Sequence, residues 1–258
     1  MHNQLLQFKP TTEISTASAS HAESNIPHAS DTQAEHNASA DSDISGTHVN
    51  NEPPAEPAEP TETAISAVPT LRLVNQSIVD MQIKYSDAVG WLTIPNTLID
   101  YPFVQANDNN HYLHTDLDQR WSQAGTIFMD YRNSNDFSDF NTIIFGHNMK
   151  NGSMFGSMQK FDNPGFFDSN KTGTIFLADM TYELEIIAFA VIKPDDTGIY
   201  NPYITTEADR IAFLDYVKSV ARHYRYADIT PDDRFITLST CNYEFNDARM
   251  VIIARIVA

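Results

Sequence analysis

A series of short apolar runs is the feature that most constrains the fold of this chain. From Val89 onward, stretches rich in β-branched and aromatic residues are bounded by Gly, Pro, Asn and Asp, which form turns. We expect strands at 89–94, 101–104, 125–129, 142–145, 174–177, 183–192, 235–239 and 250–257. About eight strands separated by such turns predict a mainly β protein with a closed or nearly closed β-barrel.

Two segments have the spacing of amphipathic helices. Leu71, Val74, Ile78 and Met81 recur at steps of three and four residues, which predicts an N-terminal helix that packs on the barrel. A second helix is expected to begin at Thr206, because a threonine followed three residues later by an acid is a typical N-cap. Its predicted apolar face consists of Ile211, Leu214, Val217, Ala221 and Tyr224.

Residues 1–70 differ in composition from the rest of the chain. They hold ten acidic side chains against one basic one, few large apolar residues, and a Pro- and Glu-rich stretch at 52–60. Such a segment cannot bury enough surface to become ordered, so we expect a disordered stalk or a tail without a specific role, and a globular domain over 71–258. The formal net charge of −18 makes nucleic acid an unfavourable partner.

Cys241 is the only cysteine, and it ends the apolar run that begins at Phe235. A single thiol can neither form an internal disulfide nor bind zinc together with other cysteines, so a nucleophile or an inert buried side chain remain as interpretations. Arg249 follows eight residues later and opens the next apolar run. We expect a thiol at a strand end, beside a loop and near an arginine, to be partly exposed in a positive field.

His147 stands out among the nine histidines because it too follows an apolar run, directly after Gly146. A thiol and an imidazole at two strand ends are what a Cys-His active site needs, since the groups must meet in space and not in sequence. His111 and His114 have a helical spacing, but no third ligand is evident, so no metal site is predicted. Asp130, Asp136 and Asp139 lack the spacing of a calcium loop and are interpreted as solvated loop charges.

Several segments together resemble the sortases, the cysteine transpeptidases of Gram-positive surfaces. The segment 237–241 (TLSTC) with the following Arg249 resembles the sortase signature, and 145–156 resembles the histidine segment of class B. The segments 89–95, 99–102 and 124–133 are also similar to class B sortases. These motifs occur in the family's order and cover about 71–258.

The resemblance implies an eight-stranded sortase-type β-barrel with an N-terminal helix and a long helix before the cysteine strand. It implies that Cys241 forms a thioacyl intermediate and that His147 acts as acid and base. Arg249 is expected to stabilise the oxyanion or a substrate carbonyl; the alternative is a surface ion pair with Asp247 or Glu244. Four further residues are expected to contact the peptide: Ser239, Thr240, Tyr203 and Ile204. For Ser239 and Thr240, packing within the strand is an open alternative.

The resemblance also implies partners and a location. The substrates would be surface proteins with an Asn-Pro-x-Thr-like sorting signal, the acceptor an amine of a peptidoglycan precursor or a pilin lysine, and no cofactor would be needed. Sortases act at the extracytoplasmic face, usually tethered by an N-terminal helix. The printed sequence contains neither a membrane-spanning stretch nor a secretory signal. Either an upstream anchor is missing from this sequence, or the protein is held or exported differently.

Two other functions are compatible with the residues alone. A cysteine protease would use the same Cys-His-Arg site with water as the acceptor. A non-enzymatic surface β-domain on an acidic stalk would instead bury Cys241 in its core.

Overall fold

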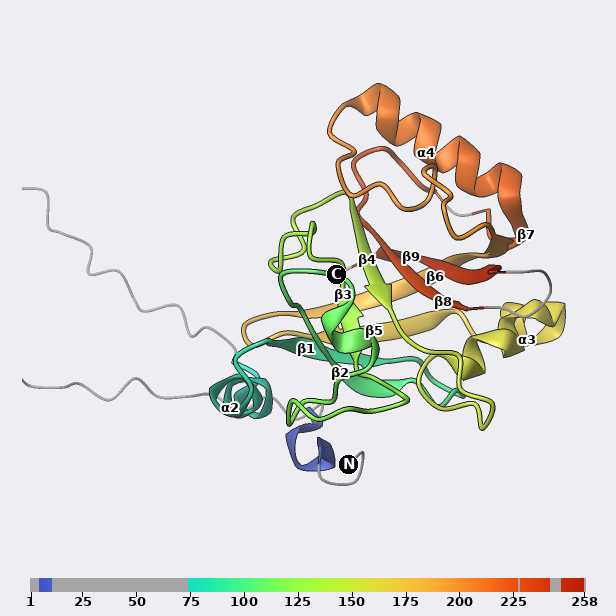
Figure 1. Cartoon of the computed structure of the whole chain (residues 1–258). Helices are drawn as coiled ribbons and strands as arrows, with labels where there is room; N and C mark the ends of the chain where they lie inside the picture. The colour runs from blue at the N-terminus through green and yellow to red at the C-terminus, as the bar shows by residue number, and fades with distance from the viewer. Residues whose placement is uncertain (1–4, 11–73, 227, 242–246, 258) are drawn as a thin grey trace, which may run out of the picture. The chain divides into compact units, whose positions relative to one another are not determined.

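The computed structural model describes residues 5–10, 74–226, 228–241 and 247–257, with the backbone alone at Cys241. Strands dominate this part of the chain (Figure 1). The strands are β1 (Ala88–Thr93), β2 (Asp100–Val104), β3 (Ile127–Met129), β4 (Asn141–Phe145), β5 (Thr172–Phe176), β6 (Thr181–Ile192), β7 (Ala221–Tyr224), β8 (Phe235–Cys241) and β9 (Arg249–Ile256). The helices are α2 (Gln76–Lys84), α3 (Pro164–Ser169) and α4 (Glu207–Val220), with 3-10 turns η1 (Leu6–Phe8), η2 (His111–Leu113) and η3 (Gly156–Asp162).

Strand pairing closes the sheet into a barrel. In the described part of the chain the strand order is β5-β1-β2-β3-β4-β8-β9-β6-β7, and an additional pairing of β5 with β6 joins the two ends of an eight-strand ring. Two pairs, β2 with β3 and β4 with β8, are parallel, and the other pairs are antiparallel. The predicted eight-stranded barrel is therefore confirmed, and each of the eight expected runs contains a strand.

The barrel wall is buried on both faces over much of its area. Along β9, Met250 and Ile252 belong to the interior cluster, whereas Val251 and Ile253 belong to a second cluster outside the wall. Such alternation follows from the two-residue period of a strand. Because both faces are covered, β9 is a nearly continuous apolar run, as the sequence has it.

Helix α4 covers the outer face of the wall next to β6 and β9 (Figure 1). The Thr206 side chain accepts a hydrogen bond from the backbone N–H of Asp209, which confirms the predicted cap. The predicted apolar face is wrong in part, because Phe213 and Val217 are the buried residues and Ile211 is 45% exposed.

The end of this helix also differs from the prediction. Ala221 and Tyr224 were expected on its apolar face but belong to β7, a ninth strand that the sequence did not predict. Strand β7 pairs with the free side of β6, where His223 lies opposite Phe189. Backbone hydrogen bonds to β6 therefore replace the last helical turn.

Helix α2 and the segment 5–10 cover the outer face near β1. Ile78 and Met81 are fully buried in a third cluster, which confirms the N-terminal helix, although it begins at Gln76 and the predicted residue Leu71 lies outside the described residues. Leu5 joins the same cluster, and the Lys9 ammonium lies 2.5 Å from the Asp100 carboxylate.

The docked segment corrects the prediction of disorder over 1–70 at residues 5–10. Three large apolar side chains within four positions give this short stretch enough surface to pack. The rest of 1–70 lies outside the described residues, and its disorder stays a prediction. Within the described part of the chain, no helix combines the length and the apolar character needed to cross a bilayer.

Candidate active site

Strand register brings the predicted reactive residues to one end of the barrel. In the parallel pair β4–β8, Phe145 lies opposite Ser239, and the Gly146 N–H donates to the Ser239 carbonyl at 3.1 Å. His147 and Cys241 each follow two positions beyond this pair. In the antiparallel pair β8–β9, Cys241 lies directly opposite Arg249.

The His147 imidazole has a defined orientation. Its Nε2 lies 2.6 Å from the carbonyl oxygen of Leu113, and its ring stacks on that of His114 with centroids 5.3 Å apart. A carbonyl oxygen only accepts hydrogen bonds, so Nε2 carries the proton of this bond. In a neutral imidazole, Nδ1 is then the nitrogen that can accept a proton.

The Leu113 carbonyl is held in turn by its neighbours. The Tyr112 hydroxyl donates to Asp87 at 2.8 Å and accepts from Gln119 at 2.9 Å. Burial, together with the hydrogen bond to Asp87, raises the pKa of Tyr112 to about 12. The Thr126 N–H donates to the Tyr112 carbonyl at 3.0 Å, which ties this segment to the start of β3. The group that orients His147 is therefore part of a hydrogen-bonded loop.

Arg249 is partly buried and lies at the start of β9. Its Nη1 donates to the backbone carbonyls of Asp247 and Ala248, at 2.9 and 3.3 Å. Among the described residues it therefore contacts the main chain of Asp247 and not the carboxylate that we considered as an alternative partner. Glu244, the other considered partner, lies outside the described residues.

One pocket of about 310 Å³ contains four of the predicted site residues: His147, Ser239, Thr240 and Arg249. Its other lining residues are Asn109, Leu113, Phe128, Asp130, Arg132, Phe145, Gly146, Pro194 and Tyr200. The Cys241 side chain lies outside what the structure describes, so its predicted exposure and positive field stay predictions. Its backbone directly follows Thr240 at the pocket.

The two hydroxyl residues before the cysteine have different surroundings. The Ser239 hydroxyl lies 2.7 Å from the Tyr200 hydroxyl. Thr240 is 3% exposed, and its Oγ1 has no hydrogen-bond partner among the described residues. A buried hydroxyl normally has a partner, so the Thr240 Oγ1 is an exception within the described part of the chain.

The loop between β6 and α4 reaches the pocket through Pro194 and Tyr200, which differ from the predicted residues Tyr203 and Ile204. Ile204 is 5% exposed and packs in the cluster that contains Phe213 and Val217, so its side chain is covered by the protein, and the expected peptide contact stays a prediction. Tyr203 is 65% exposed and does not line the pocket as the structure describes it. Tyr200 does line the pocket, and its ring lies 6.0 Å from that of Phe145.

An ion pair that the sequence did not predict also faces this pocket. The Arg132 guanidinium donates to both oxygens of the Asp130 carboxylate, at 2.9 and 2.7 Å. Burial acts to raise the pKa of Asp130, but the hydrogen bonds from Arg132 outweigh it and hold the pKa below its ordinary value. The interpretation of Asp130 as a solvated charge is therefore wrong, because its side chain is fully buried.

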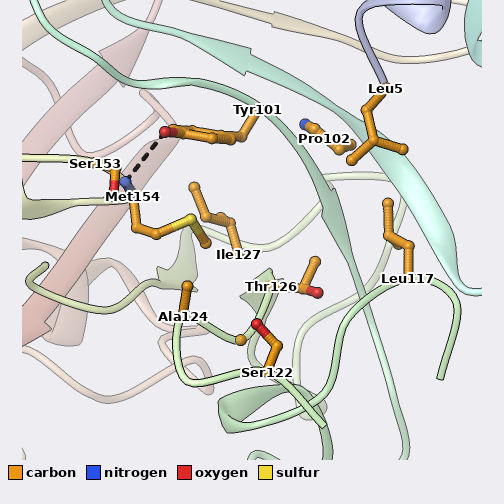
Figure 2. Close-up of a pocket in the computed structure, with 11 residues that line it drawn as sticks. Leu5, Tyr101, Pro102, Leu117, Ser122, Ala124, Thr126, Ile127, Ser153 and Met154 are labelled. Atoms are coloured by element: carbon orange, nitrogen blue, oxygen red, sulfur yellow. Dashed lines mark hydrogen bonds between the residues drawn. The ribbon is translucent and has the colours of Figure 1, made fainter. Parts of the chain in front are cut away.

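A second pocket, of about 240 Å³, is lined in part by Ser153 and Met154 from the loop that follows His147 (Figure 2). Leu5, Leu117 and Ile127 line it from three separate segments, and Tyr101 and Met154 lie at its far side. The Met154 N–H donates to the Tyr101 hydroxyl at 3.2 Å. This pocket contains none of the predicted site residues among its described lining.

Comparisons with known proteins agree with one another. Residues 92–257 match the family model of the sortase domain. Sortase B of Listeria monocytogenes is 41% identical over 190 residues, which cover 71% of this chain and 75% of that protein.

Solved structures give the same result. Sortase B of Clostridium perfringens, in a mutant form, superposes with a TM-score of 0.68 at 30% identity and covers 71% of this chain and 87% of its own. Sortase B from the Type II pilus of Streptococcus pneumoniae superposes with a TM-score of 0.61 at 38% identity and covers 69% of this chain and 97% of its own.

Proposed function

The chain belongs to the sortase family of cysteine transpeptidases, and we propose that Cys241, His147 and Arg249 carry out its reaction. The observation that carries this assignment is the register of three strands. Of two adjacent parallel strands, β8 ends in Cys241 and β4 ends two residues before His147, and the third strand sets Arg249 opposite the cysteine. The pocket that contains His147, Thr240 and Arg249 supports the same assignment.

The reaction has two acyl transfers. The Cys241 thiolate attacks the carbonyl carbon of the scissile peptide bond, the C–N bond breaks, and His147 gives a proton to the leaving amine. An acceptor amine then attacks the thioester, His147 accepts a proton from that amine, and the thiolate leaves. Both steps pass through an oxyanion, which the guanidinium of Arg249 stabilises by a charge-assisted hydrogen bond.

Sortases act on the sorting signals of surface proteins at the cell envelope and transfer them to amine acceptors. For this chain we propose an Asn-Pro-x-Thr-like signal and an amine of a peptidoglycan precursor, with the reaction at the extracytoplasmic face. One structural neighbour is named as a sortase B of a pilus, so a pilin lysine is the second candidate acceptor. Ser239, Thr240 and Tyr203 remain proposed contacts of the peptide.

A cysteine protease would share every proposed catalytic residue and differ only in its acceptor. Family membership favours the transpeptidase and excludes the non-enzymatic β-domain. The two enzymes are distinguished by products, because only a transpeptidase forms a new amide when an amine is present.

The test is mass spectrometry of products from a panel of pentapeptides mixed with triglycine or a lysine peptide. We expect an amide product with the matching peptide, and we expect Cys241→Ala to form none while its circular dichroism stays that of the wild type. Hydrolysis that no amine affects would favour the protease, and full activity of Cys241→Ala would remove the mechanism.

A further inference from the structure

The segment that carries Tyr200 is bound to the barrel wall at three consecutive carbonyl groups. The Asn141 Nδ2 donates to the carbonyls of Ile199 and Asn201, at 2.9 and 3.3 Å. The Arg132 Nη2 donates to the carbonyl between them, that of Tyr200, at 3.3 Å. These bonds fix the path of the loop between β6 and α4, which lies far from both donors in the sequence.

The two donors are themselves held firmly. Asn141 is fully buried in β4, and its Oδ1 accepts a hydrogen bond of 2.7 Å from the Thr237 hydroxyl on β8. Arg132 is oriented by both oxygens of the buried Asp130 carboxylate. A guanidinium held through both Nε and Nη2 has little freedom, so the second N–H of Nη2 has a fixed direction, toward the Tyr200 carbonyl.

Tyr200 in turn connects this loop to the strand of the nucleophile. Its hydroxyl contacts Ser239, which stands two residues before Cys241, and its ring lies beside that of Phe145, two residues before His147. The ring therefore stands in the pocket wall where β4 and β8 both end. A shift of the loop would move this wall without moving either reactive strand.

We propose that Asn141 and Arg132 are positioning residues that hold Tyr200 in place and so keep the peptide-binding wall preformed. This inference rests on the proposed function, in which the pocket receives a sorting peptide. Groups fixed before binding cost no ordering entropy when the ligand arrives, so loosening the wall weakens ligand binding. The chemical step, which depends on Cys241, His147 and Arg249, is expected to change little.

The test compares Arg132→Lys and Asn141→Ala with the control Thr142→Val in steady-state transpeptidation. Lysine keeps a charge near Asp130 but lacks the fork, and Asn141→Ala removes both donated bonds. We expect KM for the peptide to rise about three- to tenfold, the effect of about one hydrogen bond, with kcat within about twofold. Loss of folded enzyme would lower kcat instead, so the two parameters separate positioning from stability.

Thr142→Val is a matched control from the same strand. Thr142 is as buried as Asn141, but its hydroxyl has no partner among the described residues, so we expect an unchanged KM. In a Tyr200→Ala background, Arg132→Lys should have no further effect on KM, because its action passes through Tyr200. A KM unchanged in both variants, or an effect that persists without Tyr200, would overturn the inference.

Amide hydrogen exchange over 198–203 gives a readout that does not depend on turnover. We expect faster exchange in Arg132→Lys and Asn141→Ala than in Thr142→Val, and equal exchange in all three would overturn the positioning role. A wild-type protein that transfers no peptide would instead contradict the proposed function, and the exchange data would still decide the inference.

Discussion

At the scale of single residues, Arg249 uses some of its N–H donors in described hydrogen bonds, and its other donors have no described partner. Its described bonds go to two nearby carbonyls through Nη1, so donors remain on the guanidinium for a substrate or an oxyanion. A surface ion pair would have occupied the group with a carboxylate and left a weaker donor. The described contacts are compatible with the catalytic role proposed for Arg249.

Arg249→Lys is expected to lower kcat about 10²-fold, because a lysine cannot present the same planar set of donors to the oxyanion. The measurement is the rate of thioacyl formation with saturating peptide. Unfolding by urea serves as the control and should show little change in stability. Wild-type kinetics in the lysine variant would exclude Arg249 as an oxyanion donor.

The lowered pKa of Asp130 leads to a prediction about the stability of the fold at acid pH. Its pKa in the folded protein lies below the ordinary value, so its charged form stabilises the fold above about pH 3.9, and that contribution is lost as the pH falls through the folded-state pKa. We expect the free energy of unfolding of Asp130→Asn to fall less steeply below pH 4 than that of the wild type. Urea unfolding at a series of pH values from 6 to 3 measures the free energy of unfolding of the variant and of the wild type. Parallel plots of this free energy against pH would contradict the prediction.

At the scale of elements, the loop that leads into β3 controls the orientation of His147. Gly125 has a φ of +56°, and an added Cβ would lie 2.4 Å from the Leu113 carbonyl oxygen, the acceptor of the His147 bond. A side chain at Gly125 must therefore displace that acceptor. Gly152 also has a positive φ, of +80°, but an added Cβ there would meet only Leu98, at 3.6 Å.

Gly125→Ala is expected to lower kcat/KM by about 10- to 100-fold, because a small misplacement of a catalytic group is costly. Gly152→Ala carries similar backbone strain without the collision and should lose some stability but little activity. Peptide cleavage assays at a temperature where both variants are folded compare them. Equal activities would show that the Leu113 carbonyl does not orient His147.

Elements differ in how far the sequence predicts them. The eight barrel strands were predictable because each is a local apolar run, and His147, Cys241 and Arg249 because they stand at the ends of such runs. Strand β7 was not predictable, since Ala221 and Tyr224 continue a helical spacing and only the pairing with β6 decides their conformation. The contacts of the Tyr200 segment with Asn141 and Arg132 depend on where the loop between β6 and α4 returns to the barrel. No local sequence pattern encodes that return.

At the scale of the whole molecule, the segment 5–10 packs on the barrel's outer wall beside α2 and β1. Leu5 is 7% exposed and packs with the residues of α2 and β1, while Leu6 beside it is 41% exposed. Leu5 also lines the pocket of Figure 2, so the docked segment closes one side of that pocket. The wall around β1 is thus completed by residues distant in sequence.

Leu5→Asp is expected to lower Tm by up to about 5 °C, because it places a charge among apolar side chains and releases the segment 5–10. Leu6→Asp is the matched control and should leave Tm within about 1 °C, as expected for an exposed position. Differential scanning calorimetry of the full chain measures both. The same Tm in both variants would show that the segment adds nothing to stability.

The parallel pairing of β4 with β8 limits how this protein can change over evolution or in engineering. The connections between the two strands can gain or lose residues while the ends of the strands stay together, because the barrel's own hydrogen bonds set that distance. One residue inserted within 141–145 or 235–241 would turn every later side chain of that strand to the opposite face of the wall. Insertions are therefore tolerable in the connecting loops, whereas the lengths of these two strands are fixed.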